Sequence, residues 1–185
     1  MADHVRGADL SSLAPGVALG IRLHRRVDAL TDSNPGMAEL KSLVEPGLRR
    51  YAGILYDVFL DHVLLSQWSA RQGEPLADFT AAVYASLARA APVMPEPARS
   101  ATEHFVRFGA LTSCATTAGV AATLARIARR LKHPVDLAAG VATLERHGEH
   151  LQAELPSVFA AVREEALDYL GSSLRMRPSG LSVSR

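Results

Sequence analysis

The stretch Ile54-Leu-Tyr-Asp-Val-Phe-Leu-Asp-His-Val-Leu-Leu65 decides the fold class of this chain. A helix with this sequence is apolar on nearly every side, which predicts that it is buried on nearly every side. Alanine and leucine also recur along the rest of the chain, at positions where β-branched residues would dominate a sheet protein. We therefore predict an all-α fold built around this helix.

Start and stop signals divide the chain into helices, and its length fits one domain of about 100–200 residues. Pro15 opens a first helix that Ser11 or Ser12 can cap, and Asn34 caps a second helix that begins at Pro35. We expect helices at about residues 16–30, 35–44, 47–70, 75–91, 98–131 and 135–169, with Pro156 kinking or dividing the last. Residues 1–170 then form one helical domain, followed by a disordered polar tail at 171–185.

Charge and cysteine content exclude several classes of partner and location. Lys and Arg total 20 and Asp and Glu total 19, so bulk charge predicts neither a nucleic acid nor a membrane as partner. Cys114 is the only cysteine, which excludes an internal disulfide, and no apolar signal region follows the N-terminus. No uncharged apolar run reaches the ~20 residues of a membrane span. We expect a soluble, cytoplasmic protein.

Two pairs of side chains point to a metal site. Asp57 and Asp61 share one face of the apolar helix, where unpaired buried carboxylates would cost several kcal/mol without a cation or hydrogen bonds. His24 and Asp28 have the same spacing on the first helix, and His62 follows Asp61. Two such helices suit a mixed nitrogen and oxygen site for manganese, iron, magnesium or zinc.

Each of these features also has a structural interpretation. Asp28 can form an ordinary ion pair with Arg25 or Arg50, as Asp/His pairs on helices often do. The basic residues Arg22, Arg25, Arg26, Arg49 and Arg50, and the second run Arg126, Arg129, Arg130 and Lys132, can be solvated helix faces. The first group lies beside the candidate ligands and is the better candidate for phosphate recognition. We expect Cys114 to be buried and inert, because no histidine or cation neighbours it in sequence.

Three segments together resemble a known enzyme family. They are Ala2-Asp-His-Val-Arg-Gly7, Gly20-Ile-Arg-Leu-His-Arg-Arg-Val-Asp-Ala-Leu-Thr-Asp32, and Arg49-Arg-Tyr-Ala-Gly-Ile-Leu-Tyr-Asp-Val-Phe-Leu-Asp-His62 with Trp68 after it. Their order and spacing are similar to those of the acyl carrier protein phosphodiesterases, which are related to the HD-type phosphohydrolases. The resemblance covers residues 2–70 well and is only a helical pattern beyond residue 75.

The resemblance implies an HD-like helical domain that hydrolyses the phosphodiester between 4′-phosphopantetheine and a serine of holo acyl carrier protein. It implies a divalent metal, with Mn²⁺ expected and Mg²⁺ or Fe²⁺ as alternatives. It also assigns roles to individual residues. The metal ligands or their supports would be Asp3, His24, Asp28, Asp57, Asp61 and His62. Asp28, Asp57 and Arg25 would be catalytic, with Arg25 and Arg26 on phosphate oxygens.

Two departures from the family pattern leave other readings open. The family normally has a helix before the Asp3 element, whereas Met1 stands directly in front of it here, so an N-terminal helix is expected to be missing. An Asp-Trp-Leu type cluster expected in the second half is replaced by Gly109-Ala-Leu111. The alternatives are an HD-type phosphohydrolase of a small nucleotide or phosphate ester, and an inactive relative that only binds carrier protein.

Overall fold

The computed structural model describes residues 7 and 9–175, and every regular element among them is a helix. In chain order the elements are α1 (Pro15–Ser33), α2 (Pro35–Ser42), η2 (Arg49–Tyr51), α3 (Ala52–Ser66), α4 (Trp68–Gln72), α5 (Leu76–Ala90), η3 (Ala91–Val93), α6 (Glu96–Arg107), α7 (Ala110–Cys114), α8 (Thr117–Ala128), η4 (Leu137–Gly140) and α9 (Val141–Arg175). The predicted all-α fold is confirmed.

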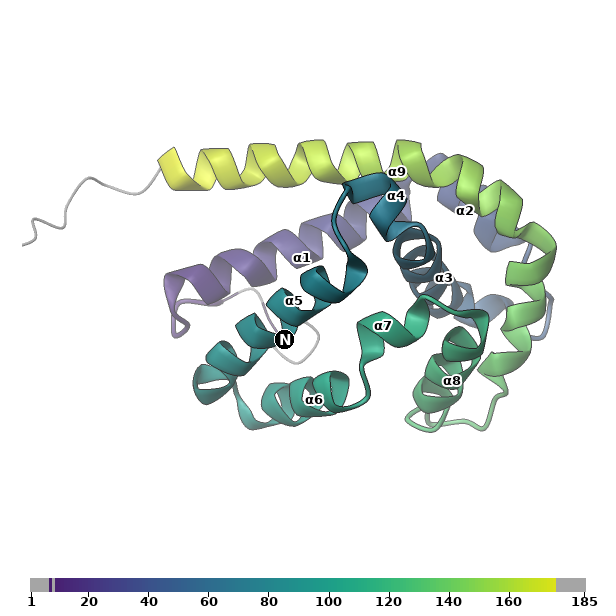
Figure 1. Cartoon of the computed structure of the whole chain (residues 1–185), viewed down its shortest axis with the longest axis horizontal. Coiled ribbons are helices and arrows are strands. Elements are labelled where there is room, and N and C mark those ends of the chain that lie inside the picture. The colour runs from purple at the N-terminus through teal and green to yellow at the C-terminus, as the bar shows by residue number, and fades with distance from the viewer. Residues whose placement is uncertain (1–6, 8, 176–185) are drawn as a thin grey trace, which may run out of the picture.

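Helix α3 lies at the centre of the molecule, as its composition predicts. It packs against α2, α7, α8 and α9 (Figure 1), and Leu55, Tyr56, Phe59 and Val63 are at most 1% exposed. The carboxylates of the same helix differ from our expectation, because the Asp57 and Asp61 residues are exposed. The prediction that both side chains are fully buried is therefore wrong, although the protein around Asp61 still displaces enough water to raise the pKa of its carboxyl.

Helix α1 is held at the edge of the molecule by α2 and α9. It packs along α9 (Figure 1), where Arg26 pairs with Glu165 and lies over the Tyr169 ring at 5.4 Å. Helix α3 also packs on α2 and α9. Because α1 and α3 lean on the same two helices rather than mainly on each other, a space remains between their facing sides.

Local signals explain several helix boundaries. The Asn34 side chain accepts hydrogen bonds from the backbone N–H groups of Gly36 (2.9 Å) and Met37 (3.3 Å), which confirms the predicted cap of α2. The cap predicted for α1 is wrong, because Ala14 precedes that helix and no side chain caps it. The expected helix at 47–70 is also two helices, because α3 ends at Ser66 and α4 begins at Trp68, which stacks on Phe79.

The region 98–131 is three helices instead of the single helix its pattern allows. Gly109 adopts a left-handed conformation (φ 54°) that separates α6 from α7. Gly119 does not break its helix; it lies inside α8 against the carbonyl of Ser113, where a side chain would overlap that oxygen. The chain thereby turns twice within a few residues and packs α7 and α8 against α3, with α6 beside α7.

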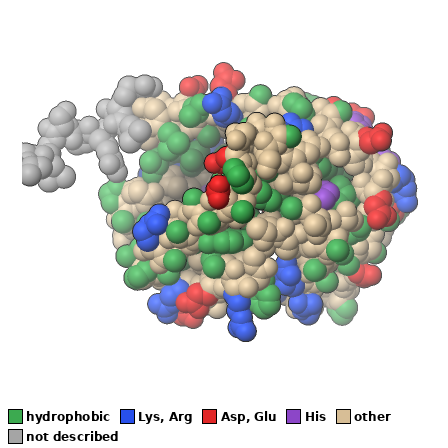
Figure 2. Space-filling model, viewed as in Figure 1, with side chains coloured by type: hydrophobic (Ala, Val, Ile, Leu, Met, Phe, Trp, Pro, Cys, Tyr) green, Lys and Arg blue, Asp and Glu red, His purple; other side chains and the backbone are tan. Residues whose placement is uncertain are grey.

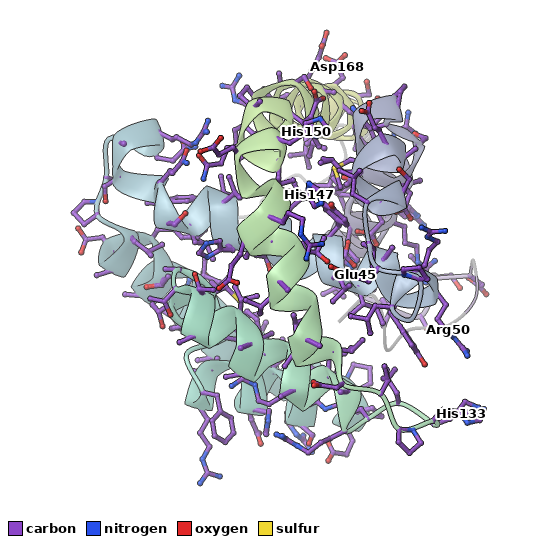
Figure 3. The ribbon with its side chains drawn as sticks, turned by 90° about the vertical axis from the view of Figure 1, so that its right-hand side faces the viewer. Glu45, Arg50, His133, His147, His150 and Asp168 are labelled. Atoms are coloured by element: carbon purple, nitrogen blue, oxygen red, sulfur yellow. The ribbon has the colours of Figure 1, made fainter. Side chains whose placement is uncertain are left out.

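The last helix, α9, has the predicted length but begins and ends about six residues later than predicted, and it curves around one end of the molecule (Figure 1). It continues through Pro156 without being divided, and it reaches Arg175, so residues 171–175 of the expected tail are helical. Residues 176–185 lie outside the described part. Glu45 lies beside the start of this helix (Figure 3), where Thr143 and Arg146 donate to its carboxylate, the latter at 2.8 Å.

Apolar side chains remain visible on one face, over α5 and α6 (Figure 2). Val93 and Phe108 are 67% and 46% exposed, although they are large hydrophobic residues. Over residues 7 and 9–175, no helix combines the length and the apolar character needed to cross a membrane. These apolar side chains therefore lie on the surface and are not part of the hydrophobic core.

Candidate active site

The space between α1 and α3 is a cleft of about 600 Å³ that brings both predicted pairs together. It is lined by His24, Asp28, Thr31, Asp32, Gly53, Ile54, Asp57, Leu60 and Asp61. One wall comes from the exposed turn of α1, and the other from the acidic side of α3. Four of the predicted site residues, two from each helix, thus line one cleft although they are about thirty residues apart in sequence.

On the α1 wall, His24 and Asp28 form a pair. The Nε2 atom of His24 lies 3.4 Å from Oδ2 of Asp28, and the two side chains are 46% and 53% exposed. An exposed pair of this kind contributes little to stability, typically below about 1 kcal/mol. Its carboxylate and imidazole are accessible to a ligand in the cleft.

On the α3 wall, Asp57 and Asp61 lie one helical turn apart. Loss of surrounding water, and then the charge of Asp57, raise the pKa of Asp61 to about 6. The Asp61 side chain is solvent-accessible, but it lies between two hollows whose walls displace much of the bulk water around it. A cation in this position would relieve the repulsion between the two carboxylates.

His62 does not line this cleft. Its Nδ1 lies 2.8 Å from the carbonyl oxygen of Cys114, and since a carbonyl only accepts, Nδ1 is the donor in this hydrogen bond. The contact ties α3 to the end of α7. Histidines that bind metals commonly donate their second N–H in this way, but the structure places His62 apart from the other predicted ligands.

The predicted phosphate-binding arginines diverge. Nη1 of Arg25 donates to the carbonyl of Gly7 at 2.8 Å, which ties the start of the described chain to α1. Arg26 is directed to α9, where it pairs with Glu165. Asp3 lies outside the described residues. Arg50, a structural alternative for Asp28, lies over the ring of Tyr51 at 5.0 Å.

The donor set of the cleft is of a type that divalent metals accept, because carboxylate oxygens with one imidazole suit Mn²⁺, Fe²⁺ and Mg²⁺. Within the described part of the chain, however, no three His, Cys, Asp or Glu side chains converge closely enough to hold a metal ion. The residues present therefore fit a metal by their chemistry, and closure of the site requires side-chain movement or a further ligand.

A second hollow adjoins this cleft at Asp61 and was not anticipated from the sequence. It is a groove of about 470 Å³ between α3, α6, α7 and α8, with Leu87 of α5 at its edge. Its walls include Phe105, Phe108, Leu111 and the arginines Arg126 and Arg130. The only sequence signal for it was the run of basic residues on α8, which also fitted a solvated face.

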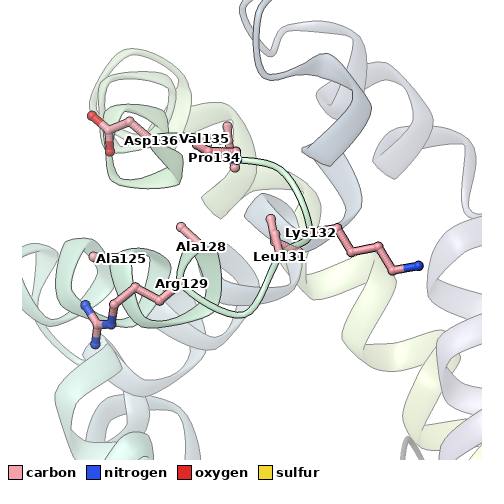
Figure 4. Close-up of a pocket in the computed structure, with 8 residues that line it drawn as sticks. All are labelled: Ala125, Ala128, Arg129, Leu131, Lys132, Pro134, Val135 and Asp136. Carbon is pink, nitrogen blue, oxygen red and sulfur yellow. The ribbon is translucent and has the colours of Figure 1, made fainter.

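A larger hollow, of about 740 Å³, lies between the end of α8 and η4 (Figure 4). Its lining residues are Ala125, Ala128, Arg129, Leu131, Lys132, Pro134, Val135 and Asp136. The side chains of Arg129 and Lys132 point away from each other (Figure 4). Its lining holds one carboxylate and no histidine, so the smaller cleft between α1 and α3 is the better candidate for an active site.

A family model described as acyl carrier protein phosphodiesterase matches residues 1–162. The chain belongs to this family. The match covers α1 to most of α9, and hence both walls of the cleft and the groove beside it. The resemblance recognised in residues 2–70 is confirmed and extends beyond them.

Curated relatives of this family match a shorter segment. The acyl carrier protein phosphodiesterases of Escherichia coli O45:K1 and O127:H6 are each 42% identical over 81 residues, which is 43% of this chain and 42% of theirs. The relative in Escherichia coli O139:H28 is 41% identical over 80 residues. The matched segment is thus under half of each relative's length. No solved structure matches, so the HD-like relationship stays a prediction.

Proposed function

We propose that this chain hydrolyses the phosphodiester that joins 4′-phosphopantetheine to a serine of holo acyl carrier protein. The observation that carries the proposal is the cleft in which His24 and Asp28 of α1 face Asp57 and Asp61 of α3, in a member of the acyl carrier protein phosphodiesterase family. Paired carboxylates with an imidazole are the groups that metal-assisted hydrolysis of phosphate esters uses.

In this proposal His24, Asp28, Asp57 and Asp61 hold a divalent cation, most simply Mn²⁺, with Mg²⁺ and Fe²⁺ as alternatives. The chemistry that such a cation supplies when bound is neutralisation of the phosphoryl charge and acidification of water. Asp3 lies four residues before Gly7, which Arg25 of α1 holds by a hydrogen bond, and we propose Asp3 as a further ligand. His62 then supports α3 through the carbonyl of Cys114 instead of joining the first four residues.

The residues of the chain position the ester. Asp28 holds the His24 imidazole on the α1 wall, and Asp57 supplies a carboxylate on the opposite wall. We assign the phosphate to Arg25 of the two predicted arginines, because Arg26 is paired with Glu165. Water attacks phosphorus, the bond between phosphorus and the serine oxygen breaks, and that oxygen takes up a proton. The phosphate leaves on the pantetheine arm, and apo carrier protein remains.

We propose the cytoplasm as the site of this reaction and an acidic carrier protein as the partner. The single cysteine is buried as expected, at 4% exposure, and burial raises the pKa of its thiol. Because the thiolate is the reactive form of cysteine and burial disfavours it, we propose no redox or nucleophilic role for Cys114. Nothing in the charge balance of the chain calls for a nucleic acid.

Mass spectrometry of holo acyl carrier protein incubated with the protein and Mn²⁺ tests the proposal. The expected result is loss of the phosphopantetheine mass with metal, and no loss with a chelator or with the double variant Asp57→Ala, Asp61→Ala. A matched control is Asp78→Ala, Asp168→Ala, which removes two exposed carboxylates outside the cleft and should retain activity.

Two other outcomes would redirect the proposal. Faster metal-dependent turnover of a small phosphate diester than of holo carrier protein would favour a small-molecule phosphohydrolase. Binding of holo carrier protein without release of the arm, in the presence of each of the three metals, would favour a binding protein that lacks activity.

A further inference from the structure

The groove beside Asp61 is built as a binding surface for a small, partly apolar group. Its volume of about 470 Å³ lies within the ~300–1,000 Å³ range of small-molecule sites. Its walls are mainly apolar, with the hydroxyl groups of Thr102 and Thr123 and the guanidinium groups of Arg126 and Arg130 among them. An apolar surface with a few fixed polar groups is the usual composition of such sites.

Phe108 shows that this surface is not fully covered within the domain. It lines the groove and is 46% exposed, although exposure of an aromatic ring to water is unfavourable. His104 lies 4.4 Å from its ring and Arg107 lies over the ring at 5.6 Å. The face over α5 and α6 also shows many apolar side chains, with Lys and Arg side chains along its lower edge (Figure 2).

The groove and the cleft between α1 and α3 share one residue, Asp61, which lines both. Burial raises the pKa of the Cys114 thiol in the groove wall, and the charge of Asp61 raises it further while that of Arg126 lowers it. Asp61 and Arg126 therefore both lie near Cys114. Nη2 of Arg126 donates to Thr123 at 2.6 Å, which holds the guanidinium in place. A phosphorus atom held in the cleft near Asp61 would therefore have its substituent beside a residue that also lines the groove.

We propose that the groove binds the pantetheine arm of the substrate, an inference that rests on the proposed function. The arm carries a dimethyl group and methylene groups that suit Phe105, Phe108 and Leu111. It also carries two amides that need hydrogen-bond partners, and Thr102 and Thr123 offer hydroxyl groups for them. The phosphate then lies at the Asp61 end, within the part of the groove wall that Arg126 makes positive.

Short α7 is the element that makes this arrangement. Gly109 turns the chain into it, Tyr84 of α5 accepts a hydrogen bond from the backbone N–H of Leu111 at 3.2 Å, and Gly119 allows α8 to approach its end closely. The end of α7 is in turn fixed to α3 by His62. Thus His62, predicted as a metal ligand, acts in this structure as a positioning residue between the cleft and the groove.

The test fills the groove without touching the cleft. Ala101 on α6 lines the groove, so Ala101→Trp is expected to lower the affinity for free 4′-phosphopantetheine, measured by calorimetry, at least tenfold. The matched control is Ser100→Trp, an exposed position on the same helix outside the groove lining, which should bind like the unmodified protein. Ala101→Leu, a smaller change, should give an intermediate loss and guards against misfolding of the Trp variant.

Turnover separates this inference from the proposed function. If the unmodified protein releases the arm from holo carrier protein, Ala101→Trp should raise KM for that substrate at least tenfold, whereas Ser100→Trp should leave this KM and the hydrolysis of bis(4-nitrophenyl) phosphate unchanged. Equal binding and equal KM in all variants would overturn the groove as the arm site while the function stands. If the unmodified protein binds 4′-phosphopantetheine in the groove but releases none from carrier protein, the proposed function fails instead.

Discussion

The cleft and the groove meet at Asp61 but are built in different ways. The cleft takes its polar groups from two helical turns, His24 to Asp28 and Asp57 to Asp61, each of them local in sequence. The groove collects side chains from five helices, and its arginines come from a run that also fits a solvated face in the sequence. Chemistry that depends on local spacing is readable from one helix at a time, whereas a binding surface assembled from many helices is not.

Loss of a carboxylate on the α3 wall should have the largest effect on function. Asp57→Asn keeps the shape of the side chain but removes its charge, so we expect turnover of holo carrier protein to fall on the order of 100-fold or more. Binding of 4′-phosphopantetheine in the groove should change far less. Steady-state kinetics and calorimetry check this pair of expectations, and equal losses in both would show that cleft and groove are not separate.

Among the helices that line the groove, the close packing of α7 on α8 should be the contact whose disruption lowers stability most. Gly119→Ala places a methyl group against the Ser113 carbonyl and is expected to lower the free energy of unfolding by about 2–3 kcal/mol. The matched control is Gly20→Ala in α1, where a methyl group would meet nothing within 4 Å. It should stabilise the protein by up to ~1 kcal/mol, because alanine is the better helix former. Denaturant unfolding of both variants measures the difference.

The two neighbouring arginines of α1 should have separable roles. Arg26→Ala removes the pair with Glu165 and the contact with Tyr169, and should cost up to ~1 kcal/mol of stability with little change in turnover. Arg25→Ala should lower turnover more than stability. Parallel thermal melts and kinetics decide the matter, and a turnover loss confined to Arg26→Ala would restore Arg26 as the phosphate ligand.

The smallest expected effect is on the stability of the metal-free protein. Because the pKa of Asp61 is raised from 3.8 to about 6 by desolvation and by Asp57, the folded state favours the neutral carboxyl. The destabilisation from its charge is absent below the unfolded value, grows as pH rises towards 6 and is complete above that. Asp61→Asn should therefore raise Tm in chelator by roughly 1–3 °C at pH 7.

The pH dependence of this variant supplies its own control. The advantage of Asp61→Asn should shrink towards zero at about pH 4, where the aspartate is largely protonated in the folded state. Added Mn²⁺ should raise Tm of the unmodified protein and leave the variant less affected. An equal Tm advantage at both pH values would mean that the charge of Asp61 is not the cause.

Much of the fold follows from short stretches of sequence. Asn34 and Pro35 set the start of α2, and the apolar residues of α3 predict its central position, because capping and burial depend on residues close together in the chain. The sequence alone did not show that the helix would break at Gly109 but continue through Gly119 and Pro156. A glycine or proline ends a helix in one packing environment and is accommodated in another.

The sequence by itself determined an all-α chain and its family. It also placed His24 with Asp28, and Asp57 with Asp61, on shared helix faces, because i,i+4 spacing does so wherever the helix lies. Only the tertiary structure decided that these faces meet across a cleft, that His62 holds α7 and Arg26 holds α9, and that Asp61 opens onto an apolar groove. Those outcomes depend on contacts between helices far apart in the chain. Helices α1 and α3 both pack on α2 and α9, and no local sequence pattern specifies that arrangement.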